Sequence, residues 1–212
     1  MKKFYFISGL GSTKESIQDF EKEMNQFGYE VQFIDIPGQY SNRDVKIQSE
    51  HHLIGWLSSE IPVGSNVIAF SMGADIAIRY HSYLQARNLI ILDGGIIDYD
   101  LMNITLEEDI AMTTSYIKEN QLDMNAETIS NLTSILREHY IDIFHAGLNT
   151  EILLLLSDYP DFVYKYKKDK IEANHNNLNH ICIQFIKDTS HELYVEKPKL
   201  IVSNIIDWIY RS

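Results

Sequence analysis

Apolar residues occur along this chain in two patterns. Short continuous runs, rich in β-branched and aromatic side chains, are typical of buried strands. Six such runs lie at residues 3–8, 30–36, 65–70, 89–92, 152–156 and 181–186. Between them, apolar residues recur every three or four positions, as on one face of an amphipathic helix. The alternation predicts an α/β fold, with a mostly parallel six-stranded sheet and helices on both faces.

Helical spacing is clearest after the first run, where four apolar residues share one face: Ile17, Phe20, Met24 and Phe27. Gly28 then provides a typical helix stop. Further helices are predicted over residues 45–57, directly after Ser71, and over residues 200–209. Residues 96–150 show helical stripes but no strand pattern. The chain is therefore expected to form one core, from residues 1–95 and 151–212, with residues 96–150 inserted. The basic run at residues 165–170 is predicted to be a solvated face.

The junction between the third strand and the next helix carries the most chemical information. Ser71 lies there in the sequence Ala69-Phe70-Ser71-Met72-Gly73. Small residues two positions before and after the serine are needed for a sharp strand–turn–helix, which exposes the hydroxyl group at the edge of the sheet. Ala69 stands where this pattern usually has its first glycine. The pattern predicts Ser71 as a nucleophile; the alternative is that Ser71 only caps the helix.

A serine nucleophile needs a general base, and His191 is the best placed of the eight histidines. It follows the last strand on a short polar loop, residues 187–190, so it can reach back over the sheet edge to Ser71. The alternative is a solvated surface histidine. His139 and His145, in the inserted segment, are also able to face this edge, but no pattern distinguishes them.

The histidine in turn needs a carboxylate to orient it. Asp158 directly follows the fifth strand and keeps the chain order serine, aspartate, histidine, so it is the predicted acid. Asp93, at the end of the fourth strand, is the alternative because its loop opens at the same edge. Asp161 is a third candidate just beyond Asp158. Aspartate is also common after strands as a turn or cap residue.

The oxyanion of a tetrahedral intermediate needs two hydrogen-bond donors. One candidate is the N–H of Met72, next to the nucleophile. The other comes from the loop Ser8-Gly9-Leu10-Gly11, in which the N–H of Leu10 is best placed. As a phosphate loop, this segment lacks the third glycine and the P-loop lysine. A dinucleotide site, which Asp35 supports only slightly, is therefore disfavoured.

Together, four segments resemble the α/β-hydrolase superfamily, and they follow its order. They are Phe6-Ile7-Ser8-Gly9-Leu10-Gly11, Ile34-Asp35-Ile36-Pro37-Gly38-Gln39, Ala69-Phe70-Ser71-Met72-Gly73-Ala74, and Ser190-His191-Glu192-Leu193 followed by Pro198. The resemblance implies that Ser71 is the nucleophile, His191 the general base and acid, and Leu10 and Met72 the oxyanion donors. It also implies that residues 96–150 form a helical cap.

Three departures from the superfamily pattern matter. Ser8 stands where histidine is common before the oxyanion glycine, and Ala69 replaces the first glycine around the nucleophile. The strand before Asp158 lacks the glycine that usually precedes the acid, so Asp93 remains an alternative. Because the first predicted strand begins at Lys3, the two leading strands of larger members are also expected to be missing.

Composition excludes several classes of partner. With 18 basic and 30 acidic residues the net charge is −12, so nucleic acid is not an expected partner. The single cysteine, Cys182, excludes an internal disulfide and a cysteine-based metal site. No metal or cofactor is expected. The chain contains no run of about 18 apolar residues, so no membrane span is predicted and a cytoplasmic protein is expected. The sequence does not specify an oligomeric state.

These features predict a serine hydrolase that cleaves a carboxylic ester or thioester of a small neutral substrate through an acyl-enzyme. The alternatives are a non-catalytic ligand-binding protein, an amide or peptide hydrolase, and a cofactor-free lyase. Ten acidic and two basic residues lie between residues 98 and 150, and this charge disfavours anionic substrates. Six side chains of the insertion are expected to line an apolar acyl pocket or to pack within the cap: Tyr99, Met102, Met112, Tyr116, Met124 and Phe144.

Overall fold

The computed structural model describes residues 2–138 and 140–211. At its centre is a six-stranded sheet in the order β2-β1-β3-β4-β5-β6, in which every neighbouring pair is parallel. The strands are β1 (Lys2–Ile7), β2 (Tyr29–Ile34), β3 (Asn66–Phe70), β4 (Asn88–Leu92), β5 (Ile152–Ser157) and β6 (Ile181–Ile186). The predicted parallel sheet is therefore confirmed, with small differences at the strand ends.

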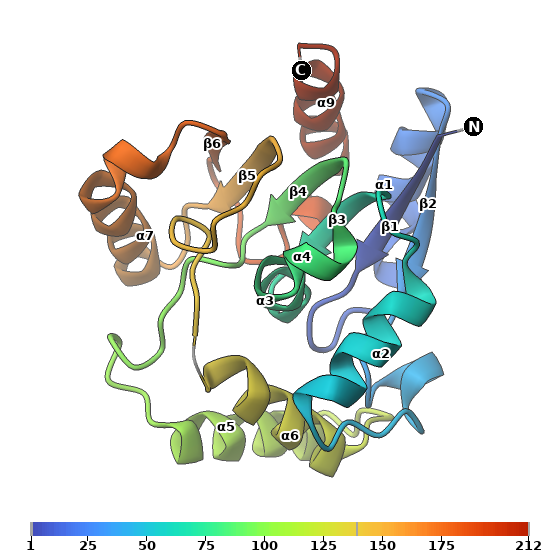
Figure 1. The fold of residues 1–212 in the computed structure, drawn as a ribbon, viewed down its shortest axis with the longest axis vertical. Coiled ribbons are helices and arrows are strands. Elements are labelled where there is room, and N and C mark those ends of the chain that lie inside the picture. The colour runs from blue at the N-terminus through green and yellow to red at the C-terminus, as the bar shows by residue number, and fades with distance from the viewer. Residues whose placement is uncertain (1, 139, 212) are drawn as a thin grey trace.

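Helices cover both faces of this sheet (Figure 1). One face packs against α1 (Gln18–Gln26), α8 (Leu193–Glu196) and α9 (Pro198–Ile209). The other packs against α2 (Glu50–Glu60), α3 (Met72–Arg79) and α4 (His81–Leu84). Side chains of β1 alternate between the two layers, with Phe4 and Phe6 in the first and Ile7 in the second. This alternation explains why the strands read as continuous apolar runs.

Two helices differ from the sequence prediction. α2 begins at Glu50 rather than near residue 45, because the side chain of Ser49 caps it by accepting a hydrogen bond from His52 N–H. The pattern also missed α7 (Asp161–Ala173), which carries the basic run and lies beside β6 in Figure 1. The prediction that this run is entirely solvated is wrong, because Lys167 is buried.

The segment between β4 and β5 contains α5 (Leu106–Glu119) and α6 (Ala126–Arg137). These helices pack against each other and form a layer at the bottom of Figure 1, away from the sheet. A capping box between Thr105 and Glu108 fixes the start of α5. Ile129 and Leu132 of α6 join the core on the α3 side of the sheet, so this layer is anchored to the rest of the molecule.

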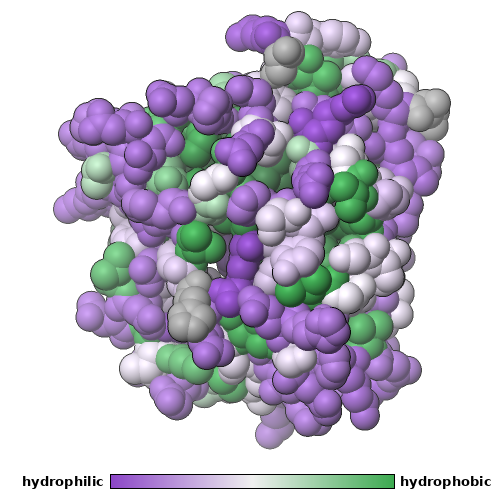
Figure 2. Space-filling model, viewed as in Figure 1, coloured by the Kyte–Doolittle hydropathy of each residue, from purple (hydrophilic) through white to green (hydrophobic). Residues whose placement is uncertain are grey.

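The described part of the chain contains no helix long and apolar enough to cross a bilayer. Figure 2 shows hydrophilic side chains over most of one face, with small groups of hydrophobic ones between them.

Gly73 allows α3 to pack tightly behind the loop that follows β1. A Cβ atom at this position would lie 2.5 Å from the backbone oxygens of Ile7 and Ser8. We expect Gly73→Ala to lower the free energy of unfolding by at least about 2 kcal/mol, because backbone has to move. Gly55→Ala, on α2, is the matched control. Its Cβ meets nothing within 4 Å, and alanine improves helix propensity by up to about 1 kcal/mol. Urea unfolding curves measure both, and equal effects would contradict this packing argument.

Candidate active site

Ser71 lies at a sharp change of direction between β3 and α3. Its backbone angles, φ 52° and ψ −122°, are unusual for a residue with a side chain. The side chain makes no capping hydrogen bond to α3, so the alternative of an ordinary N-cap is wrong. Instead, Ser71 Oγ lies 2.8 Å from Nε2 of His191. Strained backbone of this kind is characteristic of functional positions.

His191, on the loop after β6, joins Ser71 to a carboxylate. Its Nδ1 lies 2.7 Å from Oδ2 of Asp93. Because an ionised carboxylate only accepts hydrogen bonds, Nδ1 carries the ring proton and Nε2 accepts from the Ser71 hydroxyl. The imidazole ring also packs against Phe70, with ring centroids 4.7 Å apart. Ser71, His191 and Asp93 therefore form one continuous series of hydrogen bonds, which we call the Ser–His–Asp chain.

The expectation that Asp158 contacts the histidine is wrong. Its carboxylate accepts hydrogen bonds from the N–H groups of Asp188, at 3.0 Å, and Thr189, at 3.3 Å. Asp158 therefore anchors the backbone of the loop that presents His191, rather than the imidazole itself. Asp161, the third candidate, is the first residue of α7. β4 and β5 are neighbours, so Asp93 and Asp158 leave the sheet at the same edge, but only Asp93 turns toward the ring.

Four hydrogen bonds hold the buried carboxylate of Asp93. Oδ1 accepts from Ser157 N–H at 2.9 Å and Lys167 Nζ at 2.6 Å, and Oδ2 accepts from Ser157 Oγ at 2.8 Å and His191 Nδ1. Burial alone would raise the pKa of this carboxyl. The hydrogen bond from His191 and the positive charge of Lys167 outweigh burial, so the pKa of Asp93 lies below its ordinary value. Asp93 is therefore ionised at neutral pH.

Leu10 and Met72 line the same cavity as Ser71, and each has a backbone N–H to offer. Met72 is the first residue of α3, so its N–H has no partner within the helix. The N–H of Leu10 has no acceptor in the described part of the chain. The next N–H, that of Gly11, is already bonded to Gln39 Oε1 at 3.1 Å. The N–H groups of Leu10 and Met72, which the sequence suggested as oxyanion donors, therefore have no acceptor among the described residues, and both residues line the cavity beside Ser71.

Gln39 supports the loop that carries Leu10. Its side chain is fully buried, and its amide nitrogen donates to Ser8 Oγ at 2.8 Å and to Gly9 O at 3.1 Å. Ser8 Oγ also accepts from the N–H of Ile36. Ser8 and Gln39 therefore hold this loop through buried hydrogen bonds.

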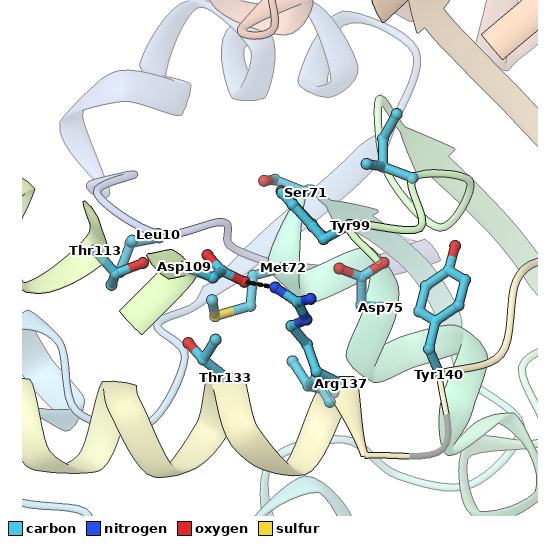
Figure 3. A pocket seen from close by; sticks show the side chains of 12 residues that line it. Leu10, Ser71, Met72, Asp75, Tyr99, Asp109, Thr113, Thr133, Arg137 and Tyr140 are labelled. Atoms are coloured by element: carbon cyan, nitrogen blue, oxygen red, sulfur yellow. Dashed lines mark hydrogen bonds and ion pairs between the residues drawn. The ribbon is translucent and has the colours of Figure 1, made fainter. Parts of the chain in front are cut away.

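A cavity of about 140 Å³ opens beside Ser71 (Figure 3). Its walls come from the loop after β1, the start of α3, and residues 97–140. The lining residues are Leu10, Ser71, Met72, Asp75, Ile97, Tyr99, Asp109, Thr113, Thr133, Leu136, Arg137 and Tyr140. Eight of the twelve belong to the inserted segment.

The charged groups of this cavity are unevenly paired. The guanidinium of Arg137 donates to Asp109, at 3.0 Å, and to Asp100. Asp75 makes no ion pair with any described residue; one oxygen accepts from Gly95 N–H at 3.1 Å. Burial raises the pKa of Asp75 to about 7, despite that hydrogen bond. The cavity therefore offers a carboxylate without a counter-ion and no uncommitted cation.

The cavity is more polar than the sequence suggested. Of the six side chains expected either to line an apolar pocket or to pack within the cap, Tyr99 alone is among the lining residues in the described structure. Met124 and Phe144 are buried in the core instead, and Met112 and Tyr116 are exposed. The buried hydroxyl group of Tyr140, which also lines the cavity, has no hydrogen-bond partner among residues 2–138 and 140–211.

Sequence reasoning missed three supporting residues, Gln39, Ser157 and Lys167. For Lys167 a signal exists, since Val163, Lys167 and Ile171 are spaced four apart on one face of a helix. His139 lies outside the described residues, and His145 bonds to Asp142 rather than to the Ser–His–Asp chain. The described residues contain no group of three or more side chains arranged to hold a metal ion.

Comparison with solved structures gives similar folds at low sequence identity. NosK from Streptomyces actuosus superposes with a TM-score of 0.74 at 14% identity, over 97% of this chain and 96% of NosK. A carboxylesterase structure from the thaumarchaeon Nitrososphaera gargenis gives 0.73 at 11% identity, over 99% and 90%. A bromoperoxidase from Bacillus anthracis gives 0.68 at 15% identity, over 99% and 92%. No protein-family model and no curated protein sequence matches the chain.

Proposed function

The chain has the α/β-hydrolase fold, and from this premise we propose that it is a serine hydrolase acting on small, polar carboxylic esters or thioesters. The observation that carries the proposal is the Ser–His–Asp chain, with its two contacts of 2.8 Å and 2.7 Å. A nucleophile, a base and an orienting acid in hydrogen-bond contact are what acyl transfer through a covalent intermediate needs.

In the first half of the reaction, Ser71 Oγ attacks the carbonyl carbon of the substrate. Nε2 of His191 takes the hydroxyl proton, and Asp93 stabilises the imidazolium that forms. The carbonyl oxygen becomes negative and accepts hydrogen bonds from the N–H groups of Leu10 and Met72. The carbon–oxygen or carbon–sulfur bond then breaks. His191 returns the proton to the leaving alcohol or thiol, and the acyl group remains on Ser71.

The second half uses water as the nucleophile. His191 removes a proton from the water molecule as its oxygen attacks the acyl carbon, and the same two N–H groups stabilise the second tetrahedral intermediate. The bond to Ser71 Oγ breaks, and His191 gives its proton back to that oxygen. A carboxylic acid leaves and the enzyme is restored. Residues 96–150 act in this scheme as a cap that surrounds the acyl group and limits the access of bulk water.

The cavity supports a short acyl group that is polar, and either neutral or cationic. Its volume of about 140 Å³ is small for a substrate site, so long acyl chains are disfavoured. Threonine, tyrosine and carboxylate groups line it, with Asp75 unpaired. An acyl group with a negative charge would face Asp75 without a free cation to balance it.

We therefore expect kcat/KM for p-nitrophenyl esters to fall at least about tenfold from butyrate to octanoate, since each methylene that does not fit a small pocket costs binding energy. Among short esters of similar size, one with an amino group at the end of its acyl chain should be cleaved faster than one with a carboxylate. Initial rates at pH 7.5 measure both trends.

Asp75→Asn supplies the control for the charge preference. The variant keeps the shape of the cavity and removes its unpaired charge, so the preference for the amino ester should shrink while the rate with butyrate stays close to that of the unmodified protein. An unchanged preference would show that Asp75 does not select the substrate.

The alternatives predict different results. A non-catalytic ligand-binding protein would cleave none of these esters. An amide or peptide hydrolase would cleave matched anilides at rates comparable to the esters. A cofactor-free lyase would leave both unchanged.

A further inference from the structure

Lys167 lies behind the Ser–His–Asp chain, in a position that the sequence did not predict. It is on α7, and its side chain is only 2% exposed. Its ammonium group donates to Asp93 Oδ1 at 2.6 Å, to Ser157 Oγ at 2.9 Å and to Ser157 O at 3.2 Å. An ammonium group has three protons to donate, so every donor of this buried cation has an acceptor.

Lys167 and His191 bond to different oxygens of the Asp93 carboxylate. Lys167 bonds to Oδ1, whereas His191 bonds to Oδ2. Ser157 links both sides, since its N–H donates to Oδ1 and its hydroxyl donates to Oδ2. These contacts leave the carboxylate no freedom to rotate away from the imidazole. The negative charge that would stabilise a protonated His191 is also shared with Lys167.

A purely structural explanation accounts poorly for this arrangement. A buried ion pair contributes little net stability compared with apolar side chains of the same volume, because both charges lose their hydration. The rest of the inward face of α7 is ordinary packing, such as Ile171 against the core. The ammonium group of Lys167 instead bonds to Asp93, the carboxylate that contacts His191.

We propose that Lys167 is a positioning residue of the active site, which fixes the Asp93 carboxylate and sets the pH range in which His191 acts as a base. The proposal rests on the proposed hydrolase function. The negative charge of Asp93 favours protonation of His191, whereas the positive charge of Lys167 opposes it. Lys167 therefore favours the neutral imidazole and extends activity to lower pH.

Other ionisable groups lie on the neighbouring elements and make no hydrogen bond to this contact in the described structure. They lie on α3, on the loop after β5, on α7, on the loop around His191 and on α8: Asp75, Asp158, Asp161, Asp188, Glu192 and Glu196. In the described structure none of them hydrogen-bonds to Asp93 or Lys167. They are unchanged when Lys167 is replaced, so a shift in the pH profile is attributable to the lysine.

The test is the pH dependence of kcat/KM for a short p-nitrophenyl ester in Lys167→Met, a nearly isosteric variant without the charge. The loss of kcat/KM at low pH, which reports protonation of the base in the free enzyme, should move to higher pH by about one unit. KM should change little because Lys167 does not line the cavity. Lys168→Met, on the exposed side of the same helix, should leave the profile unchanged.

A double variant separates an effect through Asp93 from a loss of folding. Asp93→Asn combined with Lys167→Met contains no unpaired buried charge. If Lys167 acts through Asp93, the double variant should be no slower than Asp93→Asn alone. An unchanged pH profile in folded Lys167→Met would overturn the proposal. So would a double variant whose kcat/KM falls below that of Asp93→Asn by the same factor that Lys167→Met alone loses. Absence of esterase activity in the unmodified protein would instead reject the hydrolase function.

Discussion

Asp93→Asn is expected to lower kcat by about four orders of magnitude, because an amide at this position favours the wrong tautomer of the histidine ring. The amide group of the variant would donate an N–H toward Nδ1 of His191, so Nε2 would hold the ring proton and lose its ability to accept from Ser71. KM should change little, since Asp93 does not line the cavity. Steady-state kinetics with a short p-nitrophenyl ester measure the loss.

Asp158→Asn is the matched control for this prediction. Both aspartates follow neighbouring strands at the same edge of the sheet, but Asp158 accepts only backbone N–H groups of the loop before His191. Weakening these hydrogen bonds should cost no more than about tenfold in kcat. Loss of equal size in the two variants would mean that loop position, and not the carboxylate contact, limits the reaction.

Ser71→Ala should have the largest effect of all, a loss in kcat on the order of 10⁶. Without Oγ no acyl-enzyme forms, and only the oxyanion donors and substrate binding remain. The fold should be retained, because the Ser71 side chain supports no other element: its Oγ contacts the partly exposed ring of His191. Thermal unfolding of the variant checks this point.

A second serine variant controls for the loss of a hydroxyl group as such. The hydroxyl group of Ser130, on α6, donates to the backbone oxygen of Ala126, and Ser130 does not line the cavity. Ser130→Ala should keep nearly all activity. Ester hydrolysis by Ser71→Ala at the rate of the unmodified protein would reject Ser71 as the nucleophile.

The sequence was sufficient to predict the sheet and the position of Ser71. Buried parallel strands leave long apolar runs, and small residues flank Ser71 in the sequence, so both signals can be recognised within a few positions. His191 was predictable for a similar reason, since it follows the last strand directly. These features depend on neighbours in sequence.

The choice between Asp93 and Asp158 depended on contacts distant in sequence. Ser157 and Lys167, which hold the Asp93 carboxylate, are 64 and 74 residues away from it. Lys167 also lies within a basic run that is typical of an exposed surface. The start of α2 at Glu50 was missed because apolar residues before it, such as Ile47, are buried without being helical.

The sequence pattern also did not reveal that the cavity is polar. Helical periodicity identifies which residues of α5 and α6 face inward, but not whether they face a core or a cavity. Thr113 and Thr133 are both buried and both line the cavity, whereas Ile117 and Ile129 on the same helices pack into the core.

The most direct test of the central claim is labelling with a fluorophosphonate, which reacts with an activated serine. Intact-protein mass spectrometry and peptide mapping should find one adduct, on Ser71, and His191→Ala should slow its formation strongly because the base is lost. A folded protein that remains unlabelled, or one that is labelled equally well after Ser71→Ala, would contradict the assignment of Ser71 as the catalytic nucleophile.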